Sequence, residues 1–322
     1  MYSLIIPIYK NEDSIAKLVQ TCAWLHSQLS EKLEVVFVLD GSPDRSFEVL
    51  ETELIRVLFD FQIVSLSKNC GSFAAIRKGL EFARGDLFAV MAADLQEPKE
   101  LIVEFFKVLS SENYEVVLGM RKSRHDPLMA RLASNCFWWL YKKMIQPEMP
   151  TGGVDVFGCN RLFRDHLLGL KESHSSLVGL ILWMGFRRKI IPYDRSKREF
   201  GKSAWTLSKK FRYMLDNIFS FTDLPIQLLA LFGCLGVIIS IVFGTLIVAA
   251  KLSGAIGVPG YAATALLIMF FASLNSLGLG IIGIYVWRAF ENTKQRPEAL
   301  VMEKEGGTQW KATYIQKQSV NQ

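Results

Sequence analysis

Two long stretches without a charged residue limit what this chain can fold into. The first runs from residue 224 to 250 and the second from 258 to 287. About 20 consecutive apolar residues are enough for a helix that crosses a bilayer. We therefore predict two membrane-spanning helices, at about 224–250 and 260–287. The alternative is a hydrophobic hairpin in the core of a large soluble protein, but the sequence offers no matching third apolar layer.

The charges that flank these stretches predict their orientation. Basic residues lie at their outer ends, at Lys209, Lys210, Arg212, Arg288, Lys294 and Arg296. The linker between the stretches carries one lysine, Lys251. Because cytoplasmic flanks of membrane helices are enriched in Lys and Arg, we expect a multi-pass membrane protein with both termini in the cytoplasm. Residues 205–223 mix apolar and basic side chains, which fits either an amphipathic helix in the membrane interface or an ordinary surface helix.

The part before residue 205 alternates between strand and helix patterns. Strand patterns occur at 3–9, 34–44, 61–67, 87–93 and 114–121, and helical patterns lie between them at 11–29, 46–58, 73–83 and 99–111. This rhythm predicts an α/β fold with a mostly parallel sheet and helices on both faces. The expected domains are a cytoplasmic sheet domain at 1–204, an amphipathic helix at 205–223, the two spans within 224–290, and a cytoplasmic tail at 291–322.

Charge and cysteine content limit the classes of binding partner and the cellular compartment that fit this chain. The net charge is +6, and basic residues gather at 187–212, next to the apolar part. That placement favours a membrane surface or phosphates over nucleic acid. The five cysteines have no metal-finger spacing, which fits a reducing cytosolic compartment. No dinucleotide fingerprint follows the first strand and no P-loop occurs, so a bound phosphate would need other groups.

Polar residues gather where the predicted strands end. In open parallel sheets, ligands bind outside the carboxyl ends of the strands. Those ends hold Tyr9, Glu12, Asp40, Gly41, Ser42, Asn69, Gly71, Asp94, Gln96 and Arg121. Asp94 and Gln96 alternate along an extended backbone, so both could offer oxygen to Mg²⁺ or Mn²⁺, or they could start the next helix as caps. Asp40 could bind a base or ribose, or could only form a turn with Gly41.

Two further candidates come later in the chain. Asp155 lies among glycines and valines with no evident ion partner, so it could be a general base or a structural aspartate that binds backbone amides. Arg198, Lys202 and Ser203 surround Gly201 just before the amphipathic segment. They could hold a phosphate at the membrane surface, or they could anchor the chain to anionic headgroups.

Seven short motifs occur in a fixed order before the two apolar stretches: IIPIYKNED, VLDGSPD, LSKNCGSFAAIRKG, AADLQEP, GMRKSR, TGGVDVF and REFGKS. Together they resemble the family 2 glycosyltransferases that act on polyprenyl phosphates, the group of bactoprenol glucosyltransferase and dolichol-phosphate mannose synthase. The resemblance extends from Ser3 to about Pro297. It implies a GT-A fold and inverting transfer of a sugar from a nucleotide diphosphate, UDP-glucose by default, to polyprenyl (undecaprenyl) phosphate. This transfer would take place at the cytoplasmic face of the inner membrane, for cell-envelope glycan modification.

The resemblance also implies roles for individual residues. The nucleotide-sugar pocket would be lined by Pro7, Tyr9, Glu12, Asp40, Asn69, Gly71 and Asp94. Asp94 and Gln96 would meet Mg²⁺ or Mn²⁺ and the donor diphosphate, and Asp155 would be the base. The phosphates of donor or acceptor would be held by Arg121, Arg198 and Ser203.

The chain departs from the family pattern at two positions. Ala92 stands where the family commonly has the first aspartate of Asp-x-Asp-x-Gln, and Lys10 separates Tyr9 from Asn11. One alternative is therefore a catalytically weak membrane protein that only binds a nucleotide sugar. Another is a transferase with a different lipid or glycan acceptor. No nucleic-acid partner is expected, and glycines in the predicted hairpin would permit a homo-oligomer.

Overall fold

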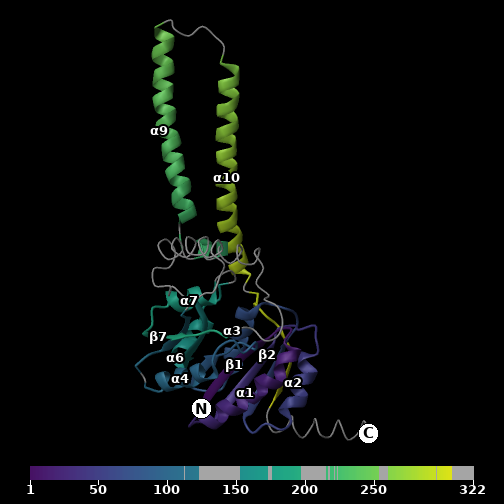
Figure 1. Ribbon diagram of the computed structural model, residues 1–322. Coiled ribbons are helices and arrows are strands. Elements are labelled where there is room, and N and C mark those ends of the chain that lie inside the picture. The colour runs from purple at the N-terminus through teal and green to yellow at the C-terminus, as the bar shows by residue number, and fades with distance from the viewer. Residues whose placement is uncertain are drawn as a thin grey trace. The chain divides into compact units, whose positions relative to one another are not determined.

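The computed structural model describes residues 1–111, 113–122, 153–172, 176–196, 215–216, 218–220, 222, 224–253, 260–294 and 296–306. The chain divides into two units, one built on a β-sheet and the other on two long helices (Figure 1). Residues 296–306 belong to the sheet unit, although they follow the long helices in the chain.

In the described part of the chain the sheet has eight strands in the order β7-β5-β6-β4-β1-β2-β3-β8. They are β1 Tyr2–Ile8, β2 Leu33–Leu39, β3 Asp60–Leu66, β4 Leu87–Val90, β5 Val116–Arg121, β6 Val154–Asn160, β7 Arg188–Tyr193 and β8 Val301–Gly306. Strands β1 to β4 pair in parallel, as do β5 and β7, whereas β6 and β8 run antiparallel to their neighbours.

Helices cover both faces of this sheet. They are α1 Ile15–Gln28, α2 Ser46–Leu54, α3 Ser72–Phe82, α4 Lys99–Leu109, α6 Arg161–Gly169 and α7 Leu177–Trp183, with a short 3-10 helix η1 Glu12–Ser14. Successive residues of a strand point to opposite faces, so Leu4 and Ile6 of β1 join one core with α1, α2 and α4. Ile5 faces the other way, where a Cβ at Gly79 of α3 would lie 2.4 Å from its Cγ2. The predicted fold class is confirmed.

Strand β8 lies in the segment 291–322, which was predicted to be a cytoplasmic tail. It pairs antiparallel with β3, from Gln62 opposite Gly306 to Leu66 opposite Val301. The Ser67 amide also donates to the Leu300 carbonyl, at 2.9 Å. The chain therefore returns to the edge of the sheet after the second long helix.

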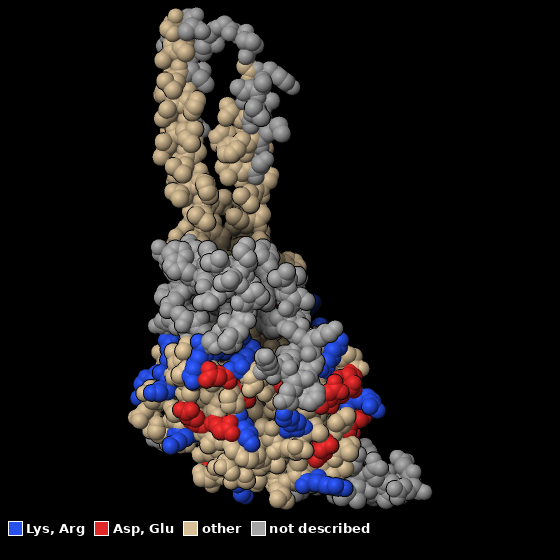
Figure 2. All heavy atoms as spheres, in the orientation of Figure 1, with Lys and Arg blue, Asp and Glu red and all other residues tan. Residues whose placement is uncertain are grey.

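The two long helices are α9 Leu224–Leu252 and α10 Tyr261–Thr293. In the most apolar stretch of α9, Leu224–Phe243, 0% of the residues are buried, and in Phe270–Thr293 of α10 only 6% are. The described side chains that are visible along the apolar parts of these helices are tan in Figure 2, whereas blue and red charged side chains gather on the sheet unit. Both stretches are long and apolar enough to cross a membrane. Most of the predicted amphipathic helix lies outside the described residues.

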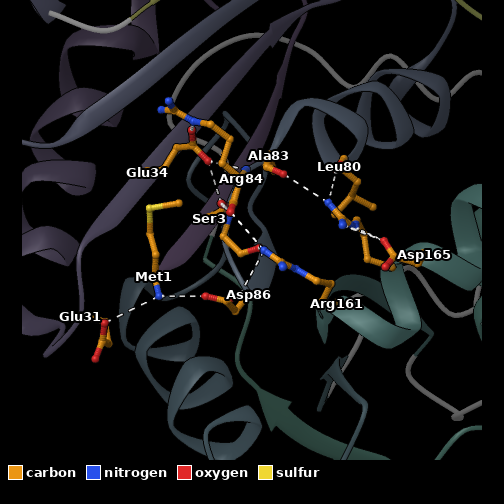
Figure 3. Close-up of polar contacts among 12 residues, drawn as sticks. Met1, Ser3, Glu31, Glu34, Leu80, Ala83, Arg84, Asp86, Arg161 and Asp165 are labelled. Atoms are coloured by element: carbon orange, nitrogen blue, oxygen red, sulfur yellow. Dashed lines mark hydrogen bonds and ion pairs between the residues drawn. The ribbon is translucent and has the colours of Figure 1, made fainter.

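A buried carboxylate organises the amino-terminal edge of the sheet. Glu34 is 0% exposed and accepts hydrogen bonds from Ser3 Oγ at 2.8 Å, Gln62 Nε2 at 2.7 Å, and Arg84 N and Nε at 2.8 and 2.6 Å. Figure 3 shows Ser3, Glu34 and Arg84 in this cluster. Burial on its own raises the pKa of Glu34, but the hydrogen bonds it accepts outweigh burial and hold its pKa below the ordinary value.

Replacing Glu34 by Gln should lower the free energy of unfolding by roughly 1–3 kcal/mol, because donors aimed at a carboxylate lose an acceptor. Since the folded pKa is depressed, the stabilisation by Glu34 is present above the ordinary pKa of 4.5 and is lost as the pH falls through the folded-state pKa. Urea unfolding followed by intrinsic fluorescence should show that the difference in unfolding free energy between the wild type and Glu34→Gln becomes smaller at low pH. Glu31→Gln, at a side chain that is 58% exposed, is the control. A difference in unfolding free energy between wild type and Glu34→Gln that does not change with pH would contradict the expectation.

Candidate active site

The carboxyl edge of the sheet collects the predicted site segments. The loops after β1, β2, β3 and β4 meet there because these strands are parallel. Since β6 is antiparallel to both β4 and β5, its first residues reach the same edge, with Val154 opposite Met120. The chain that leaves β7 also starts there, because Tyr193 is opposite Arg121.

The loops after β1 and β2 are joined by hydrogen bonds. The Lys10 amide donates to Ser42 Oγ at 2.7 Å, and the Glu12 amide donates to Asp44 Oδ2 at 3.2 Å. In return, Glu12 Oε2 accepts from the amide of Arg45, the N-cap residue of α2, at 3.0 Å. Lys10, the residue that interrupts the family motif, has φ of +57°, so it adopts the left-handed conformation within a tight turn. Asp44 was not among the site residues predicted from the sequence.

Asp40 binds the loop that follows β3. It is 2% exposed, and its carboxylate accepts from Cys70 N at 2.6 Å, Gly71 N at 2.9 Å and Asn69 Nδ2 at 3.1 Å. Burial raises the pKa of Asp40, while the backbone donors partly oppose that shift. The carboxylate thus supports the turn at 69–71. Each carboxylate oxygen has two lone pairs, so these three bonds leave capacity for one further hydrogen-bond donor.

Gly41 allows the loops after β2 and β3 to approach each other. Its φ is +55°, and an added Cβ would lie 2.3 Å from the carbonyl carbon of Lys68. Gly41→Ala should therefore force these loops apart and lower kcat/KM for a substrate bound at them by up to about 10²-fold, the effect of misplacing a bound substrate by roughly 1 Å. Steady-state kinetics at varied concentrations of that substrate check this. Gly169→Ala, where nothing lies within 4 Å, is the control, and equal kinetics in both variants would count against the expectation.

The structure places Asp94 and Gln96 in a turn rather than on an extended strand. Strand β4 ends at Val90, and Leu95 has φ of +52°, which removes the alternation expected from the sequence. The helix-cap alternative is not supported for Gln96, because α4 has Pro98 as its N-cap and the Gln96 side chain is bonded elsewhere. Asp94 is half-buried and Gln96 is 9% exposed.

Gln96 contacts the chain that leaves β7. Its Oε1 accepts from Arg195 Nη2, and its Nε2 donates to the Ser196 carbonyl at 3.2 Å. The Ser196 amide donates back to the Gln96 carbonyl at 2.9 Å. Arg195 was not among the site residues predicted from the sequence, although it lies in the basic region at 187–212.

The other predicted site residues are described to different extents. Pro7 lies in β1 opposite Val38, and the Tyr9 amide donates to Asn11 Oδ1 at 3.1 Å. Asp155 lies in β6 where the register with β5 shifts. The remaining predicted residues are the three expected to hold phosphates. Arg121 ends β5 and is half-buried, whereas Arg198 and Ser203 lie outside the described residues.

Among the described residues no group of three or more His, Cys, Asp or Glu could hold a metal ion. At the end of β4 the chain offers Asp94, and Ala92 supplies no second carboxylate. Mg²⁺ is commonly held by one or two carboxylates together with substrate phosphates. Asp94 is therefore the carboxylate that this loop could offer to a cation bound together with a phosphate.

Comparison with known proteins identifies the family. Residues 3–169 match the model of glycosyl transferase family 2. The chain is 31% identical over 309 residues to the uncharacterized glycosyltransferase YkcC of Bacillus subtilis (strain 168), covering 95% of this chain and 94% of that protein. It is 28% identical over 309 residues to the undecaprenyl-phosphate 4-deoxy-4-formamido-L-arabinose transferase of Edwardsiella ictaluri (strain 93-146), covering 93% and 92%. With the prophage bactoprenol glucosyl transferase homolog of Escherichia coli (strain K12) it shares 25% identity over 93% of this chain and 97% of that protein.

Solved structures are similar at lower identity. Glucosyl-3-phosphoglycerate synthase from Mycobacterium tuberculosis, in complex with Mn²⁺, UDP and phosphoglyceric acid, matches with a TM-score of 0.46 and 16% identity, over 68% of this chain and 76% of that one. The family match and the full-length relatives establish the class of protein, a glycosyltransferase. The chain belongs to glycosyl transferase family 2.

Proposed function

We propose that this protein is a membrane-anchored inverting glycosyltransferase that moves a sugar from a nucleotide diphosphate donor to a polyprenyl phosphate at the cytoplasmic face of the membrane. The observation that carries this proposal is the match to an undecaprenyl-phosphate transferase over 93% of the chain, a span that includes both the carboxyl edge of the sheet and the apolar helices. UDP-glucose is the default donor, and the relative named as a bactoprenol glucosyl transferase homolog supports that choice.

The geometry of the carboxyl edge supports a division of roles. The joined loops at 9–12, 40–46 and 69–71 would hold the nucleoside, and Asp94 would meet the cation and diphosphate. When bound, a divalent cation neutralises the charge that develops on the leaving group. An acceptor phosphate is already anionic near neutral pH, so positioning and charge neutralisation by Arg121 and Arg198 should matter as much as a base at Asp155. One displacement at the anomeric carbon requires no covalent nucleophile.

The long helices support membrane anchoring. The exposure of their apolar side chains disfavours a hairpin in a soluble core, because that core would have to cover them. At the end of α10, Lys294 Nζ lies 4.4 Å from the ring centroid of Phe290 and 5.1 Å from that of Trp287. Aromatic residues beside a lysine are typical of the boundary between membrane and water. We infer that α10 leaves the hydrocarbon region near Trp287.

Because the chain returns to the sheet after α10, it should cross the membrane an even number of times. Because β8 pairs with β3, residues on either side of the α9–α10 pair must lie on the same side of the membrane. A reporter fused after Gln322 should therefore be cytoplasmic, and one inserted at 255–258 should be periplasmic. Paired alkaline phosphatase and fluorescent protein fusions check this. The same compartment for both reporters would contradict two crossings.

The proposed function is tested with a panel of labelled nucleotide sugars. Membranes that contain the protein are incubated with each donor, polyprenyl phosphate and Mn²⁺, with or without a chelator, and the lipid fraction is counted. We expect one donor to give a chelator-sensitive lipid product. Label in a diacylglycerol or polysaccharide fraction would favour a different acceptor, and donor binding without any product would favour a binding protein.

A further inference from the structure

Three hydrogen bonds centred on Gln96 join the loop after β4 to the chain after β7. Its side chain uses both ends, Oε1 to Arg195 and Nε2 to the Ser196 carbonyl, and its own carbonyl accepts from the Ser196 amide. The residue is 9% exposed, so water competes little for these bonds. Gln96 thus fixes the position of Arg195 and Ser196 in the chain that leaves β7.

The second observation concerns the guanidinium of Arg195. Its Nη2 is held by Gln96, two residues from Asp94 in the chain. Its Nε is buried and has no hydrogen-bond partner among the residues that the structure describes. Buried donors in folded proteins are almost always satisfied. An arginine presents a fixed fork of donors that matches the oxygens of a phosphate, so a phosphate is a suitable partner for this atom.

We infer that Arg195 contacts a phosphate of one of the two substrates, and that Gln96 is a positioning residue which holds Arg195 for that contact. The inference rests on the proposed function, since it assigns a residue to the same carboxyl edge. The phosphate could belong to the donor diphosphate or to the acceptor lipid, which share the same anionic oxygens.

A positioning role also distinguishes Gln96 from a metal ligand. Its Oε1 accepts a hydrogen bond from a cationic donor. A divalent cation bound to the same oxygen would lie close to the Arg195 guanidinium, and the two positive charges would repel each other. The metal requirement should therefore depend on Asp94 and not on Gln96.

The test compares Gln96→Ala, Arg195→Gln, Arg195→Lys and the double variant Gln96→Ala/Arg195→Gln in the purified full-length protein. We expect Arg195→Gln to raise the KM of one phosphate substrate by about 10- to 100-fold, as for a lost charge-assisted hydrogen bond, and Arg195→Lys to recover part of that loss. Gln96→Ala should raise the same KM less, and the double variant should match Arg195→Gln, because residues that act through one another are not additive. The Mn²⁺ concentration for half-maximal activity should stay unchanged in Gln96→Ala.

Binding measurements identify the phosphate and separate this inference from the proposed function. If the donor is the source, Arg195→Gln should weaken UDP binding but leave uridine binding unchanged. If the acceptor is the source, UDP binding should be unchanged and the KM for polyprenyl phosphate should rise. Unchanged UDP binding and unchanged KM values would overturn the role of Arg195, and a raised Mn²⁺ requirement in Gln96→Ala would overturn the positioning role. A wild type that binds UDP but makes no lipid product would instead contradict the proposed function. Arg56→Gln, at an exposed position, is the control.

Discussion

Replacing Asp94 by Asn should reduce sugar transfer by about 10²–10³-fold, the usual effect of removing one preorganised charge-stabilising contact. Asp94 is the carboxylate at the end of β4, and Ala92 cannot replace it. Because the amide is neutral, a cation held here would lose the negative charge of its protein ligand. Initial rates with the donor chosen from the panel, measured over a range of Mn²⁺ concentrations, check this prediction.

Two variants sharpen the Asp94 prediction. Asp86→Asn, at the opposite edge of the sheet, removes a largely exposed ion pair with Arg161, 3.1 Å apart, and should leave the rate nearly unchanged. Ala92→Asp should lower the Mn²⁺ concentration that gives half-maximal rate, because it adds a second carboxylate. A transfer rate in Asp94→Asn close to that of the wild type would contradict a cation site at this loop. So would an unchanged Mn²⁺ concentration for half-maximal rate in Ala92→Asp.

Removing α9 and α10 should lower transfer to long-chain polyprenyl phosphate in vesicles by at least about 10²-fold, since tethering raises the effective concentration of a partner by such factors. The variant should replace residues 224–293 with a flexible linker and keep 294–306, because β8 completes the edge of the sheet at β3. Transfer to a short, water-soluble acceptor phosphate should persist. Rates with both acceptors check the prediction.

A truncation after Thr222 provides the contrast. It removes β8 as well, and with it the ion pair between Arg77 and Glu298 at 3.5 Å. An exposed edge strand invites aggregation, so this variant should be less stable than the linker variant. Full activity of the linker variant on the long-chain lipid would show that the helices are not needed to reach the acceptor.

The sequence predicted the first five strands because each is a continuous apolar run that becomes a buried parallel strand. It did not predict β8, whose residues include Glu303, Lys304 and Glu305. This edge strand is held by backbone hydrogen bonds to β3 rather than by an apolar pattern. Local periodicity cannot reveal a pairing between segments so far apart in the chain.

The position of the site was easier to predict than its contacts. Polar residues at strand ends had to meet at one edge, because parallel strands end together. The partners of those residues depend on packing in three dimensions. Asp40 binds the turn at 69–71, and Gln96 binds residues 195 and 196, pairings that connect separate loops. The prediction of an extended backbone at 94–96 was wrong because Leu95 lies in a turn, and a leucine in the left-handed conformation has no reliable sequence signal.

The most direct test of the central claim is the mass of the lipid and nucleotide products. Purified protein in detergent is incubated with undecaprenyl phosphate, Mn²⁺ and UDP-glucose, or the donor selected by the panel, and both products are measured by mass spectrometry. The proposed reaction predicts a lipid that carries one sugar on its single phosphate, together with release of the nucleoside diphosphate. Release of the nucleoside monophosphate with a sugar diphosphate lipid, or nucleotide binding with no lipid product, would contradict it.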